Sequence, residues 1–320
     1  MTEILTKLSS LFLVLICTII PNVKYEAKDS DNILLNVAII SDVHYEPSIF
    51  TSELMLTNAL KDMKNNATEN DAIIVAGDLT NSGDKELVGE FYEIMKANSP
   101  TDEWIIAAGN HDIGHADGTN ATVRKWLTDY YNEYTGSDND KIYYSKTIDG
   151  YKFIVLADES KDGWDVCHLS DKQLKFLDSE LKKATKKGKT AFVVCHWPLE
   201  RTNGQTAVYR SGKCIDGDYA KKLTDILEKY NNVFFISGHM HKGMSGEIFD
   251  KVFGFSSVET IRGVNYVNIP AFGTANRYGI PWNGTGMQME VYENEVIFRG
   301  RHYSESRWYA FTEYSVPIVK

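Results

Sequence analysis

The chain has 320 residues, of which 43% are hydrophobic and 24% are charged. This length allows one large domain or two ordinary ones, and the composition is that of a globular protein with enough apolar residues to build a core. The net charge of -10 disfavours tight non-specific contact with nucleic acid, so a nucleic-acid partner is not expected.

The N-terminal segment differs in composition from the rest of the chain. Lys7 precedes an apolar stretch from Leu11 to Ile20, and a polar segment follows it. This stretch is short for a membrane span and is typical of a secretory signal peptide, so residues 1–27 are predicted to be one. The alternative is an uncleaved N-terminal anchor, because no good cleavage motif precedes Ala27. Both interpretations predict export, to the cell surface or beyond it, and no later apolar run reaches membrane length.

Export would also affect the cysteines. Cys167 and Cys214 are candidates for a disulfide in an oxidising compartment, and free inert thiols are the alternative. Cys195 lies at the end of a predicted buried strand and is not expected to pair. Glycosylation sequons occur at Asn66, Asn120 and Asn283, and they matter only in a eukaryotic secretory pathway.

From about residue 33, continuous apolar runs alternate with amphipathic segments. Unbroken apolar runs of this length are typical of strands that are covered on both faces. Such runs are found at Ile33–Ile40, Ala72–Ala76, Trp104–Ala108, Phe153–Ala157, Ala191–Val194 and Val233–Ile236. Helices are predicted over 51–65, 84–97 and 121–133, after a capping box at Ser170-x-x-Gln173, and around Leu223 to Tyr230. The alternation predicts an α/β fold with a layered sheet and helices outside it.

The pattern changes after about residue 260. Segment 287–303 alternates apolar and polar residues on either side of a turn at 293–295, which predicts a β-hairpin. The chain contains no linker-like tract and no repeat. Residues 31–320 are therefore predicted to form a single domain whose C-terminal part, from about residue 260, is rich in β-structure.

Five of the six predicted strands end in a polar motif. These motifs are Asp42-Val43-His44, Gly77-Asp78, Gly109-Asn110-His111-Asp112, Cys195-His196 and Gly238-His239-Met240-His241. The sixth strand leads to Asp158-Glu159, for which no role is predicted. Because ligands gather at the carboxyl ends of strands in open α/β sheets, these side chains are expected to meet at one edge. The glycines that precede three of the candidate ligands predict tight turns beside a crowded site.

The donor atoms of these motifs predict a metal centre. Carboxylate, imidazole and amide oxygen together suit Mn, Fe or Zn. Asp42 and His44 are two residues apart, as are His239 and His241, so in an extended segment both members of each pair lie on one side. Taken singly, an Asp here has an ordinary explanation as a helix cap and Asn110 as a turn residue. Their occurrence together at strand ends favours metal binding, whereas His115, His168 and His302 match no motif and are assigned surface or structural roles.

The ordered set of motifs resembles that of the calcineurin-like metallophosphoesterase superfamily over residues 36–241. The C-terminal hairpin resembles that of its cyclic-nucleotide-phosphodiesterase-like branch. The resemblance implies a four-layer αββα sandwich, in which helices flank a central β-sandwich, and two divalent metal ions (Mn, Fe or Zn). It also implies hydrolysis of phosphoric esters by a hydroxide that the two ions activate.

The resemblance further implies a role for each motif residue. One metal would be held by Asp42, His44, Asp78 and His241, and the other by Asp78, Asn110, His196 and His239. Asp78 would bridge the two ions. His111 would donate to the phosphoryl or leaving-group oxygen, with Asp112 orienting its ring.

Departures from related branches narrow the expected activity. Purple acid phosphatases have a metal-binding tyrosine where this chain has Asn81, and protein phosphatases have an arginine in the same stretch. Both usually have glutamate where this chain has Asp112. Phosphodiesterase-like and nuclease-like branches remain, and the negative net charge weighs against a nuclease, so the expected function is hydrolysis of a small phosphodiester. The alternatives are a phosphomonoesterase or nucleotidase with the same metals, and a non-catalytic scaffold that keeps the fold.

The substrate pocket is predicted to be built from loops beyond the strand ends. Candidates are loops 113–122, 198–217 and 273–283. Arginine suits phosphate recognition and an aromatic ring can stack on a base, so the side chains singled out are Arg201, Tyr209, Arg210, Asn276, Arg277, Tyr278 and Trp282.

Overall fold

The computed structural model describes residues 32–319, except for residue 50 and residues 66–68, 115–117, 162–164, 206–207, 209–211, 245 and 247–255. The predicted signal peptide, the Asn66 sequon, His115, Tyr209 and Arg210 lie outside the described residues. Within the described part, no helix is both long enough and apolar enough to cross a bilayer.

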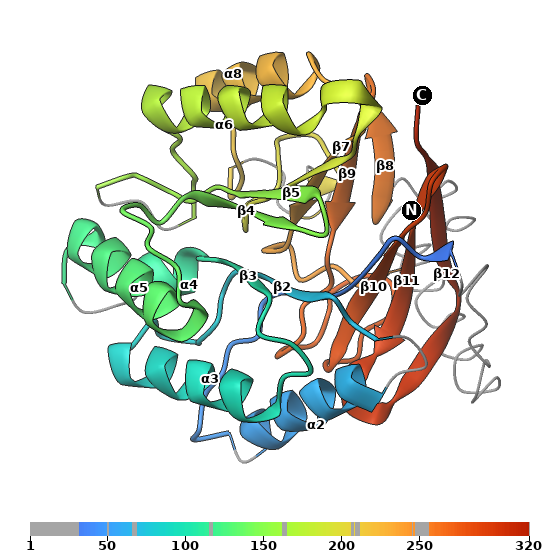
Figure 1. Cartoon of the computed structure of the whole chain (residues 1–320). Coiled ribbons are helices and arrows are strands. Elements are labelled where there is room, and N and C mark those ends of the chain that lie inside the picture. Colours follow the sequence, from blue (N-terminus) through green and yellow to red (C-terminus); the bar gives the residue numbers. More distant parts are fainter. Residues whose placement is uncertain are drawn as a thin grey trace, which may run out of the picture.

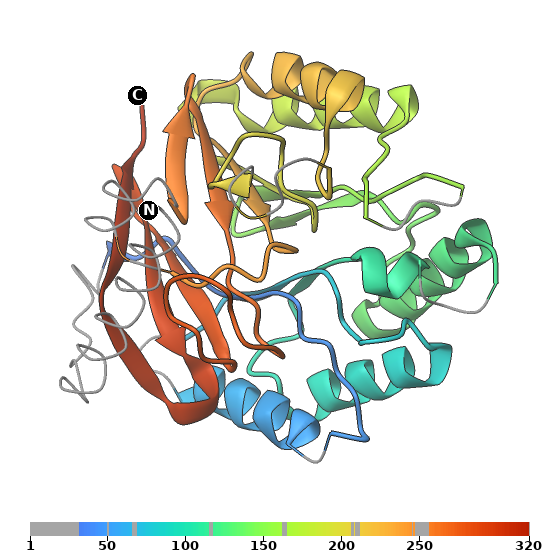
Figure 2. The same ribbon diagram turned by 180° about the vertical axis from the view of Figure 1, so that it is seen from behind.

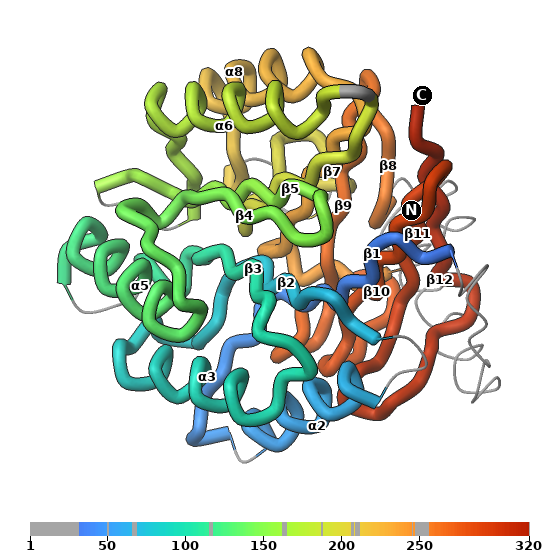
Figure 3. Tube along the Cα trace, in the orientation of Figure 1, coloured from blue at the N-terminus to red at the C-terminus, as the bar shows by residue number. Residues whose placement is uncertain are grey.

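Six strands form the first sheet, in the order β12-β11-β10-β1-β2-β3. Strands β1, β2 and β3 are parallel, whereas β10 pairs antiparallel with β1, with Val37 opposite Met289. Strand β1 therefore lies inside the sheet, beside one neighbour close in sequence and another from the C-terminal part (Figure 3). The strands are β1 (Leu35–Ile40), β2 (Ala72–Ala76), β3 (Trp104–Ala107), β10 (Thr285–Val291), β11 (Glu295–His302) and β12 (Arg307–Pro317).

The second sheet also has six strands, in the order β4-β5-β6-β7-β9-β8. Its four inner strands are parallel, and the two edge strands β4 and β8 are antiparallel to their neighbours. Its members are β4 (Tyr144–Ile148), β5 (Tyr151–Val155), β6 (Ala191–Val194), β7 (Val233–Ser237), β8 (Val258–Ile261) and β9 (Val264–Asn268).

Helices cover the outer face of each sheet (Figures 1 and 2). Helices α2 (Ser52–Asn65) and α3 (Lys85–Asn98) lie on the first sheet, and α6 (Asp171–Ala184) and α8 (Gly217–Leu227) lie on the second. Helix α5 (Asn120–Thr135) packs beside α3, after the short α4 (Asn110–Gly114). Two 3₁₀ turns complete the described elements, η2 (Lys186–Gly188) and η3 (Tyr303–Glu305). The predicted αββα sandwich is confirmed.

The apolar runs form strands because both of their faces are covered. Every residue of β1, β2, β3, β6 and β7 is buried. Fully burying one Val, Leu or Ile side chain contributes roughly 1.5–3 kcal/mol, so these strands anchor a core that runs from Leu35 to Val316. The strand at 144–148 was not predicted, and those at 258–268 and 307–317 were covered only by the general prediction of a β-rich C-terminal part, because none of them has a continuous apolar run.

The predicted capping box at α6 is only half correct. Ser170 is the N-cap and its hydroxyl accepts from the Gln173 backbone N–H at 3.1 Å. The Gln173 side chain, however, does not return to the cap. It forms paired hydrogen bonds with the backbone of Ala157 at 2.9 Å, and Glu159 accepts from the Ser170 N–H instead. Gln173 therefore fastens α6 to the segment that follows β5.

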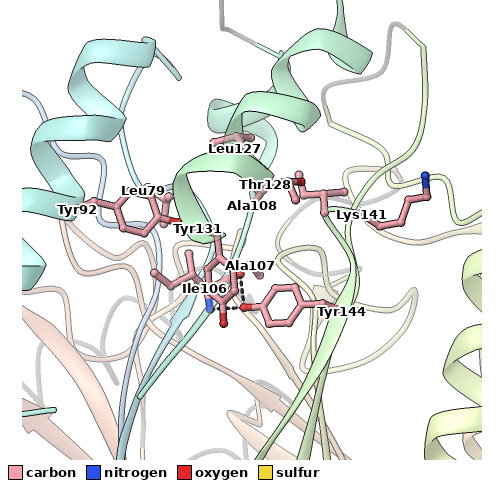
Figure 4. A pocket seen from close by; sticks show the side chains of 11 residues that line it. Leu79, Tyr92, Ile106, Ala107, Ala108, Leu127, Thr128, Tyr131, Lys141 and Tyr144 are labelled. Carbon is pink, nitrogen blue, oxygen red and sulfur yellow. Dashed lines mark hydrogen bonds between the residues drawn. The ribbon is translucent and has the colours of Figure 1, made fainter. Parts of the chain in front are cut away.

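A small cavity lies where the two sheets meet, between α5 and β3 (Figure 4). Its volume of about 20 Å³ is enough for about one water molecule. The Tyr144 hydroxyl on its wall accepts from the Ile106 N–H and donates to the Ile106 carbonyl, at 2.9 and 3.0 Å. This pair of bonds joins an edge strand of the second sheet to one of the first. None of the predicted site residues lines the cavity.

Candidate metal centre

The first group of predicted ligands comes together beyond β1, β2 and β7. One donor atom from each of Asp42, His44, Asp78 and His241 lies within 4.8 Å of the others. His241 Nε2 is 3.1 Å from Asp42 Oδ1 and 3.1 Å from His44 Nε2. His44 Nε2 is 3.7 Å from Asp78 Oδ2. We call this set the first cluster.

The second group shares Asp78 with the first. Asp78, His196 and His239 again have donor atoms within 4.8 Å of one another. His196 Nε2 lies 3.3 Å from Asp78 Oδ2, 3.1 Å from the Asn110 side-chain oxygen and 3.2 Å from His239 Nδ1. We call these four residues the second cluster. Asp78 Oδ2 therefore stands between the two clusters, as a bridging ligand requires.

The backbone of the site is held in a conformation that non-glycine residues rarely adopt. Five candidate ligands have positive φ angles: Asp42 (52°), His44 (46°), Asp78 (52°), His239 (68°) and His241 (46°). Such left-handed conformations cost of order 1–3 kcal/mol each and persist where the surrounding structure imposes them. Their concentration at one edge of the fold indicates a functional site.

Two of the three glycines that precede candidate ligands show why a side chain is excluded there. Gly77 has φ +96°, and a Cβ atom placed there would lie 2.5 Å from Nδ1 of His196. A Cβ atom at Gly109 would collide with the carboxylate and backbone of Asp78. The predicted crowding beside the ligands is therefore found at both positions, and the chain at Gly77 also uses the left-handed freedom of glycine.

Charge in the site is balanced between carboxylates and histidines. Burial would raise the pKa of Asp78, but His196 and then His44 oppose it, so that the pKa lies well below its usual range. Burial lowers the pKa of His196, but Asp78 and Asp42 outweigh it and raise the pKa to about 10. Burial, followed by the charge on His196, lowers the pKa of His239 to about 3. The two buried carboxylates therefore favour positive charge on the neighbouring His196 and His241, and a bound cation would supply that charge instead.

The donor set fits two divalent cations. Asp42 and Asp78 are 0% and 1% exposed, and among the described residues their only ion-pair partners are histidines. Asp78 Oδ2 is buried and accepts no hydrogen bond, and its neighbours His196 Nε2 and His44 Nε2 lie 3.3 and 3.7 Å away. A cation held between these three atoms would give the buried carboxylate oxygen a full partner.

His111 lies at the margin of the first cluster. Its ring is 4.6 Å from that of His44, and its backbone N–H donates to Asp78 Oδ1 at 2.9 Å. The predicted orienting role of Asp112 is wrong. His111 Nδ1 is bonded to the Asn81 carbonyl at 2.7 Å, whereas Asp112 accepts from the backbone N–H groups of Leu79, Thr80 and Gly109.

Asp112 is instead a buried anchor for the loops. Burial and then the nearby Asp78 charge raise the pKa of Asp112 to about 7, against the effect of its backbone donors. Its bonds to the segments after β2 and β3 hold Asp78 and Asn110 in register. The Asn81 carbonyl, which replaces it as the partner of His111, could not have been found from residue type because it is a backbone group.

The site is closed on one side and open on the other. Among the ligand side chains, Asp42 and His196 are fully buried, whereas His241 is 21% exposed. His111 is half-buried, so these two histidines form the more exposed side of the site. Loop 273–283 borders this side, because the Arg277 N–H donates to the His241 carbonyl and Thr274 bonds the His241 ring. Thr274 lies in a loop predicted to border the site but was not singled out.

The other predicted pocket residues are less closely tied to the site. Arg277 is exposed and Tyr278 half-buried beside His241, whereas Asn276 is buried and bonds the loop backbone. Trp282 stacks on Tyr309. Arg201 is exposed and pairs with Glu200. His168 stacks on Tyr219 and His302 is buried in β11, both structural positions.

The described cysteines are buried free thiols. Cys167 and Cys214 do not form the disulfide considered from the sequence. Burial raises the pKa of Cys214 to about 12 and that of Cys167 well above its usual value. Thiols of this kind are inert, which is the alternative that the sequence left open.

Comparison with known proteins defines the family. The sequence profile of the calcineurin-like phosphoesterases matches residues 35–243, which include every candidate ligand. The chain belongs to this family. Calcineurin-like phosphoesterases hydrolyse phosphoric esters, and here the family and the two clusters together indicate a dinuclear divalent metal site. No curated protein matches the chain in sequence.

Solved structures with the same fold include two phosphatases. A dimetal phosphatase from Danio rerio is 13% identical in sequence, with a TM-score of 0.62. That alignment covers 90% of the present chain and 100% of the Danio rerio protein. A purple acid phosphatase from yellow lupin (Lupinus luteus) seeds is 13% identical with a TM-score of 0.57. That alignment covers 88% of this chain and 53% of the lupin enzyme. These likenesses extend the shared fold beyond residue 243.

Proposed function

We propose that this calcineurin-like phosphoesterase hydrolyses small phosphodiesters with the help of two divalent metal ions. The observation that carries the proposal is the position of Asp78 Oδ2 between two clusters of metal-binding side chains. Asp42, His44, Asp78 and His241 would hold one ion, and Asp78, Asn110, His196 and His239 the other. Two ions at such a site activate water as a nucleophile and neutralise charge on the phosphoryl oxygens.

His111 would be the catalytic acid. Its Nδ1 is bonded to the Asn81 carbonyl, so Nδ1 carries a proton and Nε2 is the nitrogen that would donate to a phosphoryl or leaving-group oxygen. The hydrogen bond from the His111 backbone to Asp78 Oδ1 fixes the distance between this acid and the shared ligand. An alkoxide is a poor leaving group unless it is protonated. The imidazolium form of His111, with a proton on both ring nitrogens, would supply that proton from Nε2 and become the neutral ring that keeps its Nδ1 proton.

Two features support a diester rather than a monoester. Asn81 stands where purple acid phosphatases have a metal-binding tyrosine, which favours the cyclic-nucleotide-phosphodiesterase-like branch. The C-terminal hairpin, formed by β10 and β11, is the second feature in which the chain resembles that branch.

A phosphomonoesterase is the second candidate. Both solved structures with this fold that are described above carry the name phosphatase. A non-catalytic scaffold is disfavoured, because the ligand set and His111 are complete.

The decisive experiment compares hydrolysis of bis-p-nitrophenyl phosphate and p-nitrophenyl phosphate by protein reconstituted with Mn²⁺, Fe²⁺ or Zn²⁺. We expect the higher kcat/KM for the diester, its loss in Asp78→Ala, and a fall of about 10²-fold or more in kcat for His111→Asn with the metals retained. A higher kcat/KM for the monoester would reassign the substrate class. Equal rates for wild type and Asp78→Ala would refute the two-metal mechanism.

We also propose that the protein acts outside the cytoplasm. The apolar stretch after Lys7 supports export, by cleavage or by anchoring. Cell fractionation with N-terminal sequencing of the mature chain tests this, and an intact protein recovered from the cytoplasm would refute it.

A further inference from the structure

The loop after β9 returns to the metal edge, although it lies outside the segment that matches the family. Its backbone forms hydrogen bonds with the segment that follows β1 and with the segment that follows β7, which carry Asp42 and His241. The Phe272 N–H donates to the Ser41 carbonyl and the Gly273 N–H to the Asp42 carbonyl, each at 2.8 Å. The Arg277 N–H donates to the His241 carbonyl, also at 2.8 Å. The loop is thus attached to the first cluster rather than to the second.

One side chain of this loop contacts a metal ligand directly. Thr274 Oγ1 lies 3.0 Å from His241 Nδ1. His241 Nε2 faces the first cluster, 3.1 Å from Asp42 Oδ1. When Nδ1 carries the proton and donates it to the Thr274 hydroxyl, the lone pair of the ring is on Nε2 and points toward the cluster. With the hydroxyl as the acceptor, the contact holds the tautomer whose Nε2 can bind a cation.

His241 needs this partner more than the other ligands do. The His241 side chain is 21% exposed, whereas the side chains of His44 and His196 are 4% and 0% exposed. Packing alone therefore constrains its ring least. His196 has a comparable second bond, from Nδ1 to the Ala76 carbonyl at 2.8 Å, but its partner is a backbone group of the family segment.

The position of Thr274 is itself fixed by the loop. Asn276 is buried, and its side-chain oxygen accepts from the Ala271 N–H at 2.8 Å. Its amide group donates to the carbonyls of Ala271 and Trp282, at 3.1 and 3.3 Å. These bonds close the loop around Thr274 through protein groups alone, so the fold of the loop sets the position of the hydroxyl.

We propose that Thr274 is a positioning residue that orients His241 and thereby sets the affinity of the first cluster for its metal ion. The proposal rests on the dinuclear metal centre but not on the choice between diester and monoester. Removing an outer partner of a ligating histidine typically costs 10–100-fold in metal affinity. We expect a loss of about this size, confined to one of the two ions, when the hydroxyl is removed.

The test is a titration of the metal-free full chain with Zn²⁺ and with Mn²⁺ in competition with a chromophoric chelator, without any substrate. Thr274→Val keeps the shape of the side chain and removes the hydroxyl, and Thr274→Ser keeps the hydroxyl. Thr285→Val is the matched control, because its hydroxyl bonds Trp282 and Tyr309 in the same part of the fold and contacts no ligand. Metal content after desalting gives the stoichiometry, and melting of the metal-free proteins reports folding.

We expect Thr274→Val to bind one ion as wild type does and the other about 10–100-fold more weakly, with Thr274→Ser and Thr285→Val near wild type. Wild-type affinity for both ions in Thr274→Val would overturn the proposal. So would equal weakening in Thr274→Ser, which would point to packing instead of the hydroxyl, or equal weakening in Thr285→Val. Failure of wild type to bind two ions would instead refute the dinuclear centre on which the proposed function rests.

Discussion

The two sheets contribute different chemistry to the same site. The strand ends of the first sheet supply all the oxygen ligands, Asp42, Asp78 and Asn110, together with one imidazole, His44. The second sheet supplies only imidazoles, from His196, His239 and His241. Neither sheet alone completes a cluster, because each cluster takes at least one ligand from each sheet. The metal centre is therefore formed by the two sheets together.

The two sheets are connected to each other close to the metal centre. Ser41, just after β1, forms an isolated bridge with Ala271, which follows β9 of the other sheet. At the far edge, the Tyr144 hydroxyl bonds both backbone groups of Ile106. Thr274 belongs to the same arrangement, because it follows the Ala271 bridge and contacts His241. The same loop therefore makes both the contact that joins the two sheets at Ser41 and the contact with the His241 ring.

The largest effect should come from the ligand that both clusters share. Asp78→Asn keeps the size of the side chain but removes the charge that lies between the two clusters, so we expect loss of both ions and a fall in kcat/KM of more than about 10³-fold. His241→Ala removes a ligand of the second sheet from the first cluster alone and should leave one ion bound. Metal analysis and ester hydrolysis measure both outcomes. If Asp78→Asn retained one ion tightly, Asp78 would not be the bridge.

The next largest effect is expected on the stability of the first sheet and its helix α2, away from the metal centre. The Arg301 guanidinium on β11 donates to both oxygens of Asp62 on α2 at 2.6 and 2.7 Å, and both side chains are buried. Asp62→Ala leaves a buried charge without its partner and should lower the free energy of unfolding by roughly 3–5 kcal/mol, as measured by urea denaturation.

This change should leave the metal affinity of the folded protein unaltered, because Asp62 contacts no ligand. Asp225→Ala provides the control, since Asp225 forms an exposed pair with Lys221. Exposed pairs of this kind contribute about 0.5 kcal/mol or less. A similar small change in Asp62→Ala would mean that the layers of the first half are held by packing alone.

The smallest expected effect is a pH dependence of folding stability, which comes from His302 in β11 of the first sheet. Burial, with Arg307, lowers the pKa of His302 to about 4, against the opposing charge of Glu305. Since this folded-state value is below the usual 6.5, the neutral ring stabilises the fold fully above pH 6.5. That contribution is lost as the pH falls from 6.5 toward 4, by at most about 2 kcal/mol at pH 5.

The measurement is the slope of unfolding free energy against pH for wild type and His302→Gln, both free of metal. The variant should show the shallower slope between pH 6.5 and 4, because the other histidines contribute equally to both proteins. Parallel slopes would show that His302 titrates alike in the folded and unfolded states.

The sequence predicted the site better than it predicted what holds the site in place. The candidate ligands were placed correctly near one another because parallel strands end at the same edge, whatever their loops do. The partner of His111 was wrong, since a backbone carbonyl such as that of Asn81 has no signature in the residue types. Thr274 was missed because its role depends on how β9 pairs with β7, and the apolar pattern around β9 is too broken to indicate a strand.

The place of β1 in the first sheet bears on the order in which the protein folds. Gln288 of β10 bonds Asn36 of β1 across 252 positions of the chain. During synthesis β1 can pair with β2 early, yet its other edge stays open until nearly the whole chain has emerged. An open, apolar strand edge is a template for aggregation, and such long-range pairing is slow. We therefore expect the second sheet, whose strands are nearly contiguous in sequence, to fold first, and the yield of refolding to depend on how quickly the C-terminal hairpin covers β1.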